Sequence, residues 1–503
     1  MRVIKRRAGA ATVSVLALAA ISSAIAPTVA QAAPGPRFGD NFRLISADTP
    51  GRGPDTPGLA ADPSDPNHIV EVDSNPVTLE CDFHASFDGG RTWSGGHLRV
   101  RNSGEDPPLP TSPCDQNYDS GGYHHFDTGV VFGSGQNVYA TVSSHRGPFN
   151  RPENGLTGDG GDGDDAIVAR STDGGRTFQP AVVAIPGGGP VLPNQRGLAG
   201  RGMRPQLAVQ RGAGSGGQDR LYVASWNCFI KIRASQTARG GCSGGGGDRR
   251  IFVARSDDGG ANWNAPALAS AANVRSGGAE AEAASPDEQA REPSQPVVGP
   301  DGAVYVAYNS RDITDGTTCP VNPFITTPAP GGFSRTKAQC TVVARSTNQG
   351  QSWQQFSTNV PLPGNLPSSH PRLAIDPSRG GAQGTLYIGY QRAAGSDPAD
   401  ILLQSSTDGA QTWSNPVKVN DDTGTASQTN AWPSVGSGGR VDVTWADRRH
   451  PYPGSNMLDV YFASSANGGA SFGPNRRVTD RSINTGVGRF GDYGSYTWYG
   501  PNT

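Results

Sequence analysis

A short polar turn recurs six times along this chain of 503 residues, and this repeat constrains the fold more than any other feature. Each copy begins with Ser, carries Asp or Asn at its third position and ends with Trp or Phe. The Asp or Asn side chain is expected to bond backbone amides two residues further on, and the Gly that usually follows tolerates a positive φ. We therefore predict six hairpin turns, each with its closing aromatic ring packed beside the hairpin. The copies occupy residues 86–93, 171–178, 256–263, 346–353, 406–413 and 465–472.

The residues around each turn predict four antiparallel strands. The fifth copy shows the order most clearly, with strands expected at 371–375, 385–390, 401–405 and, after the turn, 417–419. Repeated units of four antiparallel strands form the blades of a β-propeller. The other five blades are expected to open near Pro57, Asp127, Pro205, Pro296 and Pro433.

The number of turns predicts an all-β chain folded as a six-bladed β-propeller. Residues 41–46 resemble a lone fourth strand that could close the ring against the last blade. Residues 491–498, in contrast, begin like the first strand of a further blade that the chain never completes. A seven-bladed ring, or a partial seventh blade, is therefore the alternative.

The spacing of the turns points to one end of the blades as the functional one. Successive copies start 85, 85, 90, 60 and 59 residues apart, so the early blades carry about 25 extra residues each. The extra residues fall between blades or after the second strand, and these two kinds of loop share the end of the propeller opposite the turns. Binding residues concentrate on loops held by a rigid scaffold, so we predict the functional face at this end.

The beginning of the chain has the pattern of a secretory signal peptide. Basic residues precede an apolar run at 8–26, and the small-residue site Ala30-Gln31-Ala32 follows. We expect a signal peptide at 1–32 and a single mature domain at 33–503, with a membrane anchor as the alternative reading of the apolar run. The expected protein is secreted, monomeric and free of the membrane after cleavage. A net charge of −2 lacks the basic excess of a nucleic-acid binder.

Six cysteines follow the predicted cleavage site, an even number in an exported chain, which favours disulfide bonds. Their connectivity does not follow from the sequence. Pairing of nearest neighbours would join 81 to 114, 228 to 242 and 319 to 340, and each bond would then close one long loop.

The repeated turn resembles the Asp box, or BNR repeat, of the sialidase superfamily. The resemblance extends over nearly the whole mature chain and implies a propeller whose turns face away from the active site. It further implies a carbohydrate-active hydrolase, with an extracellular glycan or polysaccharide as partner. Exo-acting sialidase is the first activity it suggests, exo-arabinanase-type hydrolysis is a near rival, and a non-catalytic propeller that binds carbohydrate or protein is the alternative of a different class.

Alignment of the blades on their first strands places acids, arginines and aromatic side chains near the mouth of the central channel. A glycosidase needs a proton donor and a nucleophile or base, and a sialidase meets the carboxylate of its sugar with arginines and uses Tyr as nucleophile. Asp127 is the acid or base candidate, His370 a proton shuttle, and Tyr493 a nucleophile with Asp492 as its base. The candidates for substrate binding are Arg204, Trp432, Gln295, Arg311 and Arg448.

Each of these residues also has a structural interpretation. Trp432 could pack between blades, Arg204 could form an ion pair between blades, and residues 447–449 (Asp-Arg-Arg) are expected to form an ion-pair network that links blades. The sialidase motif in which Arg stands two residues before Pro is not matched, because Arg204 directly precedes Pro205. The sialidase catalytic set is therefore not transferred residue by residue.

One acidic loop has the composition of a cation site. Hard cations prefer several oxygen ligands, and Gly permits the tight path of such a loop. No cofactor is required by this interpretation, but calcium is a candidate ligand, and a solvated acidic loop is the alternative. A second acidic segment, 280–292, is Ala-rich and has the composition of one short helix. The candidate calcium ligands are Asp159, Asp162, Asp164 and Asp165.

Overall fold

The chain divides into two compact units, Met1–Asp40 and Asn41–Thr503, and every residue that the structure describes belongs to the second. The structure is a computed structural model. It describes residues 55–75, 80–99, 128–145, 164–185, 198–231, 248–269, 288–291, 294–312, 338–361, 371–378, 380–394, 397–436, 438–450, 457–484 and 501–502, with only the backbone at some of their edges.

Six sheets contain all the strands of the described residues. Blade 1 contains β1 (Asp55–Asp62), β2 (Asp65–Asn75), β3 (Glu80–Ser86) and β4 (Ser94–His97), and blade 2 contains β5 (Thr128–Phe132), β6 (Val138–His145), β7 (Asp164–Ser171) and β8 (Val182–Ile185). Blade 3 contains β9 (Leu198–Gln210), β10 (Arg220–Lys231), β11 (Asp248–Ser256) and β12 (Ala267–Leu268), with a short 3-10 turn, Ser215–Gly217, between β9 and β10. Blade 4 contains β13 (Glu288–Arg291), β14 (Val297–Val298), β15 (Val304–Asp312), β16 (Ala338–Ser346) and β17 (Gln354–Pro361). Blade 5 contains β18 (Arg372–Ile375), β19 (Leu386–Ala394), β20 (Asp397–Ser406) and β21 (Val417–Lys418), and blade 6 contains β22 (Gln428–Val435), β23 (Val441–Asp447), β24 (Met457–Ser465), β25 (Arg476–Arg477) and β26 (Ile483–Asn484).

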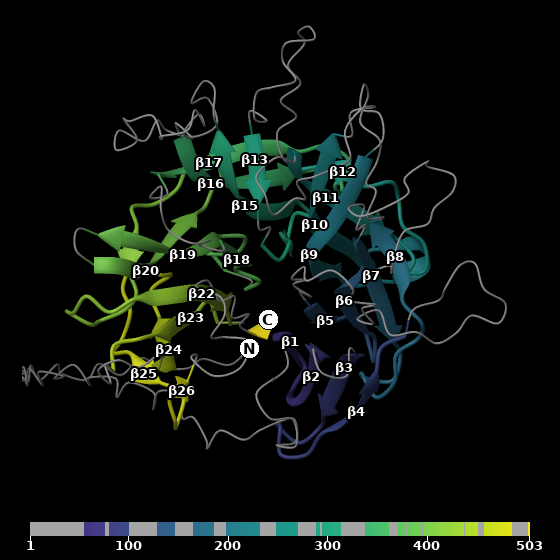
Figure 1. Ribbon diagram of the computed structural model, residues 1–503, viewed down its shortest axis with the longest axis horizontal. Helices are drawn as coiled ribbons and strands as arrows, with labels where there is room; N and C mark the ends of the chain where they lie inside the picture. Colours follow the sequence, from purple (N-terminus) through teal and green to yellow (C-terminus); the bar gives the residue numbers. More distant parts are fainter. Residues whose placement is uncertain are drawn as a thin grey trace, which may run out of the picture. The chain divides into compact units, whose positions relative to one another are not determined.

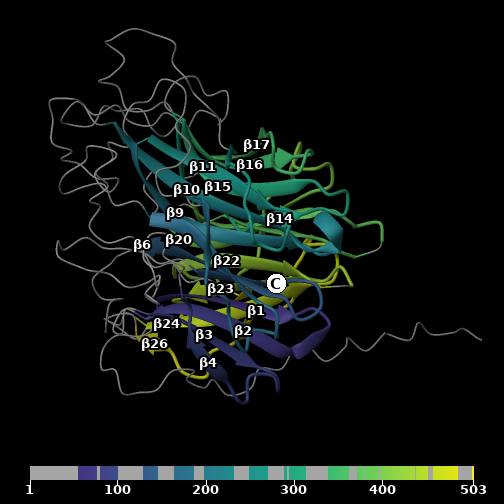
Figure 2. The same ribbon diagram turned by 90° about the vertical axis from the view of Figure 1, so that its right-hand side faces the viewer.

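The six sheets form a ring, as Figure 1 shows, and the prediction of an all-β, six-bladed propeller is confirmed. The side view in Figure 2 shows the strands running between the two ends of the ring. No α-helix occurs in the part of the chain that the structure describes, and nothing in that part is a helix long and apolar enough to cross a membrane.

The predicted strands of blade 5 match β18 to β21 closely, but blades 3 and 4 open before the expected positions near Pro205 and Pro296, with β9 and β13. β9 begins at Leu198 and β10 continues to Lys231, so parts of two predicted loops are a paired hairpin. The acidic segment 280–292 ends in the strand β13 and is not helical over Glu288–Arg291, because these residues pair with β15. The predicted closing strand at 41–46 and the start of a seventh blade at 491–498 lie outside the described residues.

A short strand near the end of the chain returns to the first blade. This strand, β27 (Pro501–Asn502), pairs in parallel with β1, opposite Leu59 and Ala60. The first four strands of every blade otherwise come from one continuous stretch of sequence. The pairing of β27 with β1 therefore connects the two ends of the propeller sequence within blade 1.

The hydrophobic core lies between the blades. Five clusters fill five interfaces, from the one between blades 1 and 2 to the one between blades 5 and 6. In the first, Val138 and Ala140 of β6 pack with Val70 and Val72 of β2. Burial of each of these valine side chains contributes about 1.5–3 kcal/mol to folding. Among the described residues no such cluster joins blade 6 to blade 1.

Each repeated turn curls around one carboxylate or amide side chain. In the first turn, Ser86 Oγ donates to Asp88 Oδ1 (2.9 Å) and accepts from the amide of Gly90 (2.8 Å). Asp88 Oδ1 accepts from the amides of Arg91 and Thr92, both at 2.9 Å, and Oδ2 accepts from the Thr92 hydroxyl at 2.6 Å. The Asp side chain thus holds amides three and four residues further on, and the expected spacing of two residues is wrong.

The turns also join neighbouring blades. His68 Nε2 of blade 1 lies 2.7 Å from the carbonyl oxygen of Gly174 in the second turn. Gly259 in the third turn has a φ of +67°, which favours Gly, and a Cβ there would lie 2.9 Å from Arg170 Nη1 of blade 2, so the two blades are close at this point. Because β3 ends at its turn, the starts of β1 and β3 and the end of β2 lie at the opposite end of the blade, which we call the far end.

We predict that Asp173→Ala lowers the free energy of unfolding at pH 7 by about 1–2 kcal/mol, because Thr177 loses the acceptor of its amide and hydroxyl. Asp173→Asn is expected to cost less. The chain itself uses Asn348 and Asn467 at this position, where each still accepts an amide. Urea unfolding of the three proteins measures the difference.

The loss of unfolding free energy in Asp173→Asn should depend on pH. Burial raises the pKa of Asp173, but hydrogen bonds from Thr177 and Ser171 lower it by more, so the pKa lies below its usual value. A lowered pKa contributes stability above the unfolded-state pKa, and that stability is lost as the pH falls through the folded-state pKa. The gap between parent and variant should therefore shrink below about pH 4, and a gap that stays constant down to pH 2 would contradict this role.

Candidate functional site

The first strands of the six blades present one residue each at the same level of the ring. The level follows from pairing with equivalent residues of the second strands, as with Gly58 opposite Val72 and Arg372 opposite Gly389. The residues at this level, in order of blades, are Gly58, Gly129, Gln206, Ser294, Arg372 and Trp432.

Side chains at this level pack from blade to blade. A Cβ at Gly58 would lie 3.0 Å from the Cα of Gly129, so the inner strands of blades 1 and 2 are in close contact. The Arg372 guanidinium lies 4.3 Å from the ring centroid of Trp432, which is 6 % exposed. Trp432 therefore packs between blades 5 and 6, which is the structural interpretation of this residue, and little of its ring is free to stack on a sugar.

Two further candidates for substrate binding lie in blades 3 and 4, one on β9 and one between β13 and β14. Gln295 Nε2 donates to the carbonyl oxygen of Leu207 at 3.1 Å and so links the two blades. Arg204 lies inside β9, and the expectation that it precedes the first strand is wrong. The register of β9 against β10 slips between Ala224 and Trp226, beside Arg204, of which only the backbone is described.

The last two candidates lie at the ends of second strands. Arg311 pairs with Gln289 in the extended hairpin of blade 4, where only its backbone is described. Arg448 follows β23, and its Nη1 donates to the carbonyl oxygen of Met457 at 3.3 Å. Both positions are at the far end, as predicted, since second strands end there.

The predicted ion-pair network of residues 447–449 is present around Arg449. Its Nη2 lies 2.8 Å from Asp447 Oδ2, and its Nη1 lies 2.6 Å from Asp421 Oδ1. Asp447 also accepts from the indole of Trp445 at 2.8 Å. Asp421 follows the last strand of blade 5, so the network joins blade 6 to the connection from blade 5.

Of the remaining candidates, only Asp164 and Asp165 belong to the residues that the structure describes. Asp164 and Asp165 belong to β7 and not to a loop, and Asp165 is 4 % exposed. Only the backbone of Asp164 is described, and calcium binding by these residues stays a prediction. The following lie outside the described residues, and their roles stay predictions: Asp127, His370, Asp492, Tyr493, Asp159 and Asp162.

Blade 1 departs from the other blades on one face of its sheet. There Glu71 pairs with His84, and Asp73 pairs with Asp82. The twenty equivalent residues of the other blades carry no charge, and most of them are buried in the clusters between blades. In the order of Glu71, Asp73, His84 and Asp82, they are Ala140, Val142, Ala169 and Ile167 in blade 2, Val223, Ser225, Ala254 and Phe252 in blade 3, Val306, Tyr308, Ala344 and Val342 in blade 4, Ile388, Tyr390, Gln404 and Leu402 in blade 5, and Val443, Trp445, Ala463 and Tyr461 in blade 6.

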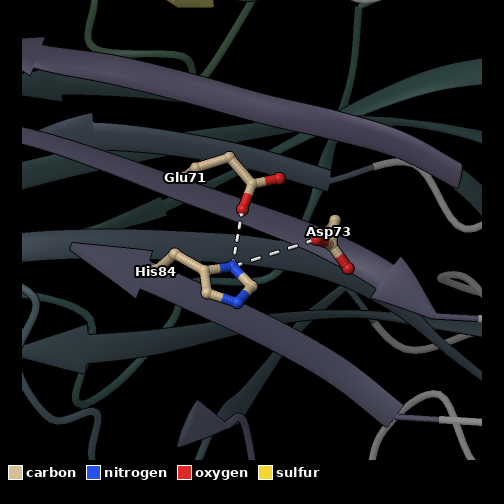
Figure 3. Close-up of side chains that lie close together, drawn as sticks. All are labelled: Glu71, Asp73 and His84. Atoms are coloured by element: carbon tan, nitrogen blue, oxygen red, sulfur yellow. Dashed lines mark hydrogen bonds and ion pairs between the residues drawn. The ribbon is translucent and has the colours of Figure 1, made fainter. Parts of the chain in front are cut away.

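Three of these side chains in blade 1 converge, as Figure 3 shows. His84 Nδ1 lies 2.9 Å from Glu71 Oε2 and 4.0 Å from Asp73 Oδ2. One ligand atom from each residue lies within 4.8 Å of the others. The side chain of His84 is 20 % exposed, whereas those of Glu71 and Asp73 are 5 % and 0 % exposed.

Burial perturbs both carboxyl groups strongly. It is the main cause that raises the pKa of Glu71 to about 8 and the pKa of Asp73 to about 9. Repulsion from Glu71 adds to the shift at Asp73. Neither oxygen of Asp73 has a hydrogen-bond donor among the described residues, so the two carboxyls share a proton or require a cation.

A second pair on the same face borders this cluster. Asp82 Oδ1 lies 2.7 Å from Nδ1 of His97, whose side chain is 49 % exposed. The negative charge of Asp82 disfavours ionisation of Glu71 and Asp73. The chemistry open to Glu71, Asp73 and His84 is to hold a proton or a metal ion, because side chains so buried cannot contact a sugar ring.

The sequence of β2 contains a signal for this cluster that the alignment of first strands does not include. The second strands of most blades follow an apolar pattern, such as Val304-Tyr305-Val306-Ala307, whereas β2 reads Ile69-Val70-Glu71-Val72-Asp73. An alignment of the blades therefore shows two acids, Glu71 and Asp73, at positions of the second strand that carry no charge in the other blades. The approach of His84 also required the register of β3.

Comparisons with known proteins return structures and no sequence families. No family model matches the chain, and no curated protein matches it. Among solved structures, a protein of unknown function from Dyadobacter fermentans is 13% identical, with 80% of this chain and 92% of that chain covered and a TM-score of 0.42. The alpha-L-arabinanase of Penicillium chrysogenum is 14% identical, with 78% and 88% covered and a TM-score of 0.40. The NanB sialidase of Streptococcus pneumoniae is 9% identical, with 82% and 76% covered and a TM-score of 0.41.

We predict that Asp73→Val raises the free energy of unfolding by about 1–3 kcal/mol in a buffer that contains EDTA. The substitution removes a buried carboxyl without a donor and introduces the residue that blade 2 uses at this position, Val142. Urea unfolding at pH 7 measures the change.

The reciprocal substitution is the control. Val142→Asp places a carboxyl in the filled interface between blades 1 and 2 and should cost about 3 kcal/mol or more. If Asp73→Val were as destabilising as Val142→Asp, the Asp73 carboxyl would have a stabilising partner, and the description of the cluster would be wrong.

Proposed function

We propose that this chain is a secreted glycan hydrolase whose substrate binds at the far end of the ring. The observation that carries the proposal is the common level of the first strands. Asp127, Arg204 and His370 precede Gly129, Gln206 and Arg372 by two residues each, and these three share one level of the ring. We therefore expect an acid, an arginine and a histidine from blades 2, 3 and 5 to approach the same channel mouth.

These residue types suit hydrolysis of a glycosidic bond. In this proposal Asp127 donates a proton to the leaving oxygen, Arg204 binds an anionic or hydroxyl-rich substrate, and His370 relays the proton. Tyr493, with Asp492 as its base, completes the pair of groups that attacks the sugar. The resemblance of the turns to the Asp box supports an exo-acting sialidase first and an exo-arabinanase-type hydrolase second.

The buried carboxyl pair of blade 1 is not assigned to this chemistry. Glu71 and Asp73 lie close together, as two glycosidase carboxyls do, but they are only 4 % and 0 % exposed. A proton donor must reach the glycosidic oxygen at hydrogen-bond distance. We therefore place the reaction at the channel mouth and keep the cluster of blade 1 separate from it.

The turns support the choice of the far end. Each of the six turns uses its Ser hydroxyl to bond its own backbone, and these bonds occupy the end of the blades at which third strands finish. Polar groups already satisfied within a turn are poor candidates for binding a substrate. The second-strand ends of Arg311 and Arg448 lie away from the turns, and in this proposal they line the substrate path.

We predict that Asp127→Asn and Arg204→Ala each reduce glycoside hydrolysis at least about 100-fold, the scale of losing general acid catalysis. Their melting temperatures should stay within a few degrees of the parent. The measurement is turnover on a panel of chromogenic glycosides and polysaccharides.

The matched controls lie at the turn end and should keep full activity. Asp65→Asn changes an exposed carboxylate that accepts from the amide of Asn67, and Arg91→Ala removes an exposed side chain of the first turn. Glycan binding without turnover, lost in Arg204→Ala alone, would replace the hydrolase by a binding propeller. Neither binding nor turnover across the panel would overturn the proposal.

A further inference from the structure

We propose that Glu71, Asp73 and His84 bind one divalent transition-metal ion of the zinc type. This site goes beyond the proposed glycan chemistry and does not depend on it. It lies on the face of blade 1 that is turned away from blade 2, because the other face of the same strands packs in the cluster with blade 2. In the ring of Figure 1, blade 6 is the remaining neighbour of this face.

The first argument comes from comparing blade 1 with the other five blades of the same chain. At the positions of Glu71, Asp73, His84 and Asp82, the other five blades have twenty uncharged residues, as given above. Four ionisable side chains at an otherwise uncharged site carry a cost in desolvation. Such a group is expected where a ligand offsets the cost.

The second argument is the Asp73 side chain itself. It is fully buried, and neither of its oxygens accepts a hydrogen bond from any donor in the described residues. Figure 3 shows its carboxyl beside the ring of His84 and near Glu71. Buried carboxylates in proteins are paired with a cation or a donor, and a metal ion between Asp73, Glu71 and His84 would supply such a partner.

The spacing of the donor atoms fits a metal ion. Four ligands at about 2.0–2.2 Å in a tetrahedron lie roughly 3.3–3.6 Å apart. The distances from His84 Nδ1 are 2.9 Å to Glu71 and 4.0 Å to Asp73, which lie on either side of that range. Side-chain movements of less than about 1 Å would therefore bring the three donors around one ion.

The donor set selects the kind of metal. Calcium takes six to eight oxygen ligands, whereas zinc accepts a mixture of imidazole nitrogen and carboxylate oxygen in fours. Two carboxylates and one imidazole leave one position for water, and the partly exposed side of His84 is the way in. Two negative carboxylates also balance the charge of a divalent ion.

A supporting pair stands next to the three ligands. Asp82, opposite Asp73 in the register, is held by His97 at 2.7 Å. Residues just outside a metal's ligands commonly orient them and tune affinity. Since Glu71 and Asp73 lie on β2 and His84 on β3, the ion would join two strands of the first blade.

The test is zinc retention by the full chain. Parent and variants are freed of metal with EDTA, equilibrated with Zn²⁺ and dialysed, and their metal content is measured by elemental mass spectrometry. The parent should retain about one Zn²⁺ per chain more than Asp73→Asn or His84→Asn. Zn²⁺ should raise the melting temperature of the parent by at least about 2 °C and leave that of Asp73→Asn unchanged.

Two controls separate this site from other zinc-binding groups. His97→Asn removes a histidine that holds Asp82 but is not a proposed ligand, and it should retain more Zn²⁺ than Asp73→Asn or His84→Asn. Asp73→Val, which is predicted to be more stable than the parent, gives a folded variant without the carboxyl. Equal Zn²⁺ content in the parent and Asp73→Val, or tighter retention of Ca²⁺ than of Zn²⁺, would overturn the proposal. Metal content is measured without any glycan, so the metal-site proposal is tested independently of the hydrolase assignment.

Discussion

Coverage of both faces of every sheet is the constraint on which this structure depends. A blade of four short strands cannot bury enough apolar surface alone, so each one relies on its two neighbours in the ring. Five interfaces meet the demand in the same way, with apolar side chains of the second and third strands packed against those of the next blade. The face of blade 1 that contains Glu71 and Asp73 is the exception, because the residues that should be apolar there are charged.

The turns and the blade interfaces act at different ranges. A turn such as that of Asp88 satisfies its own amides within a few residues, and the same bonds recur in every copy. Yet the turns also contact the preceding blade. Gly259 of the third turn lies beside Arg170 of blade 2, and Gln349 of the fourth turn accepts from Arg255 of blade 3. A local device thus becomes part of the packing between blades, which explains why it is repeated once per blade.

The charged face of blade 1 shows how stability and function can oppose each other. Filling the positions of Glu71, Asp73 and His84 with the residues of any other blade would remove the cost of two buried carboxyls. The chain instead keeps acids and a histidine at that place, and proteins retain such costs mainly at functional sites. On the first strands no such cost arises at Arg372 and Trp432. These residues lie at equivalent positions of blades 5 and 6, and the Arg372 guanidinium packs on the Trp432 ring.

The sequence by itself determined the elements that depend on short-range order. Six turns, four strands around each and the ring that follows were all predictable, because a turn bonds within four residues and a strand alternates every two. The packing of Trp432 against Arg372 was not predictable from the sequence, and neither was the start of β9 before Arg204. Both depend on contacts with other strands. Only the tertiary structure brought His84 to Glu71 and Asp73. The three residues stand on two strands, and the register between those strands decides which side chains meet.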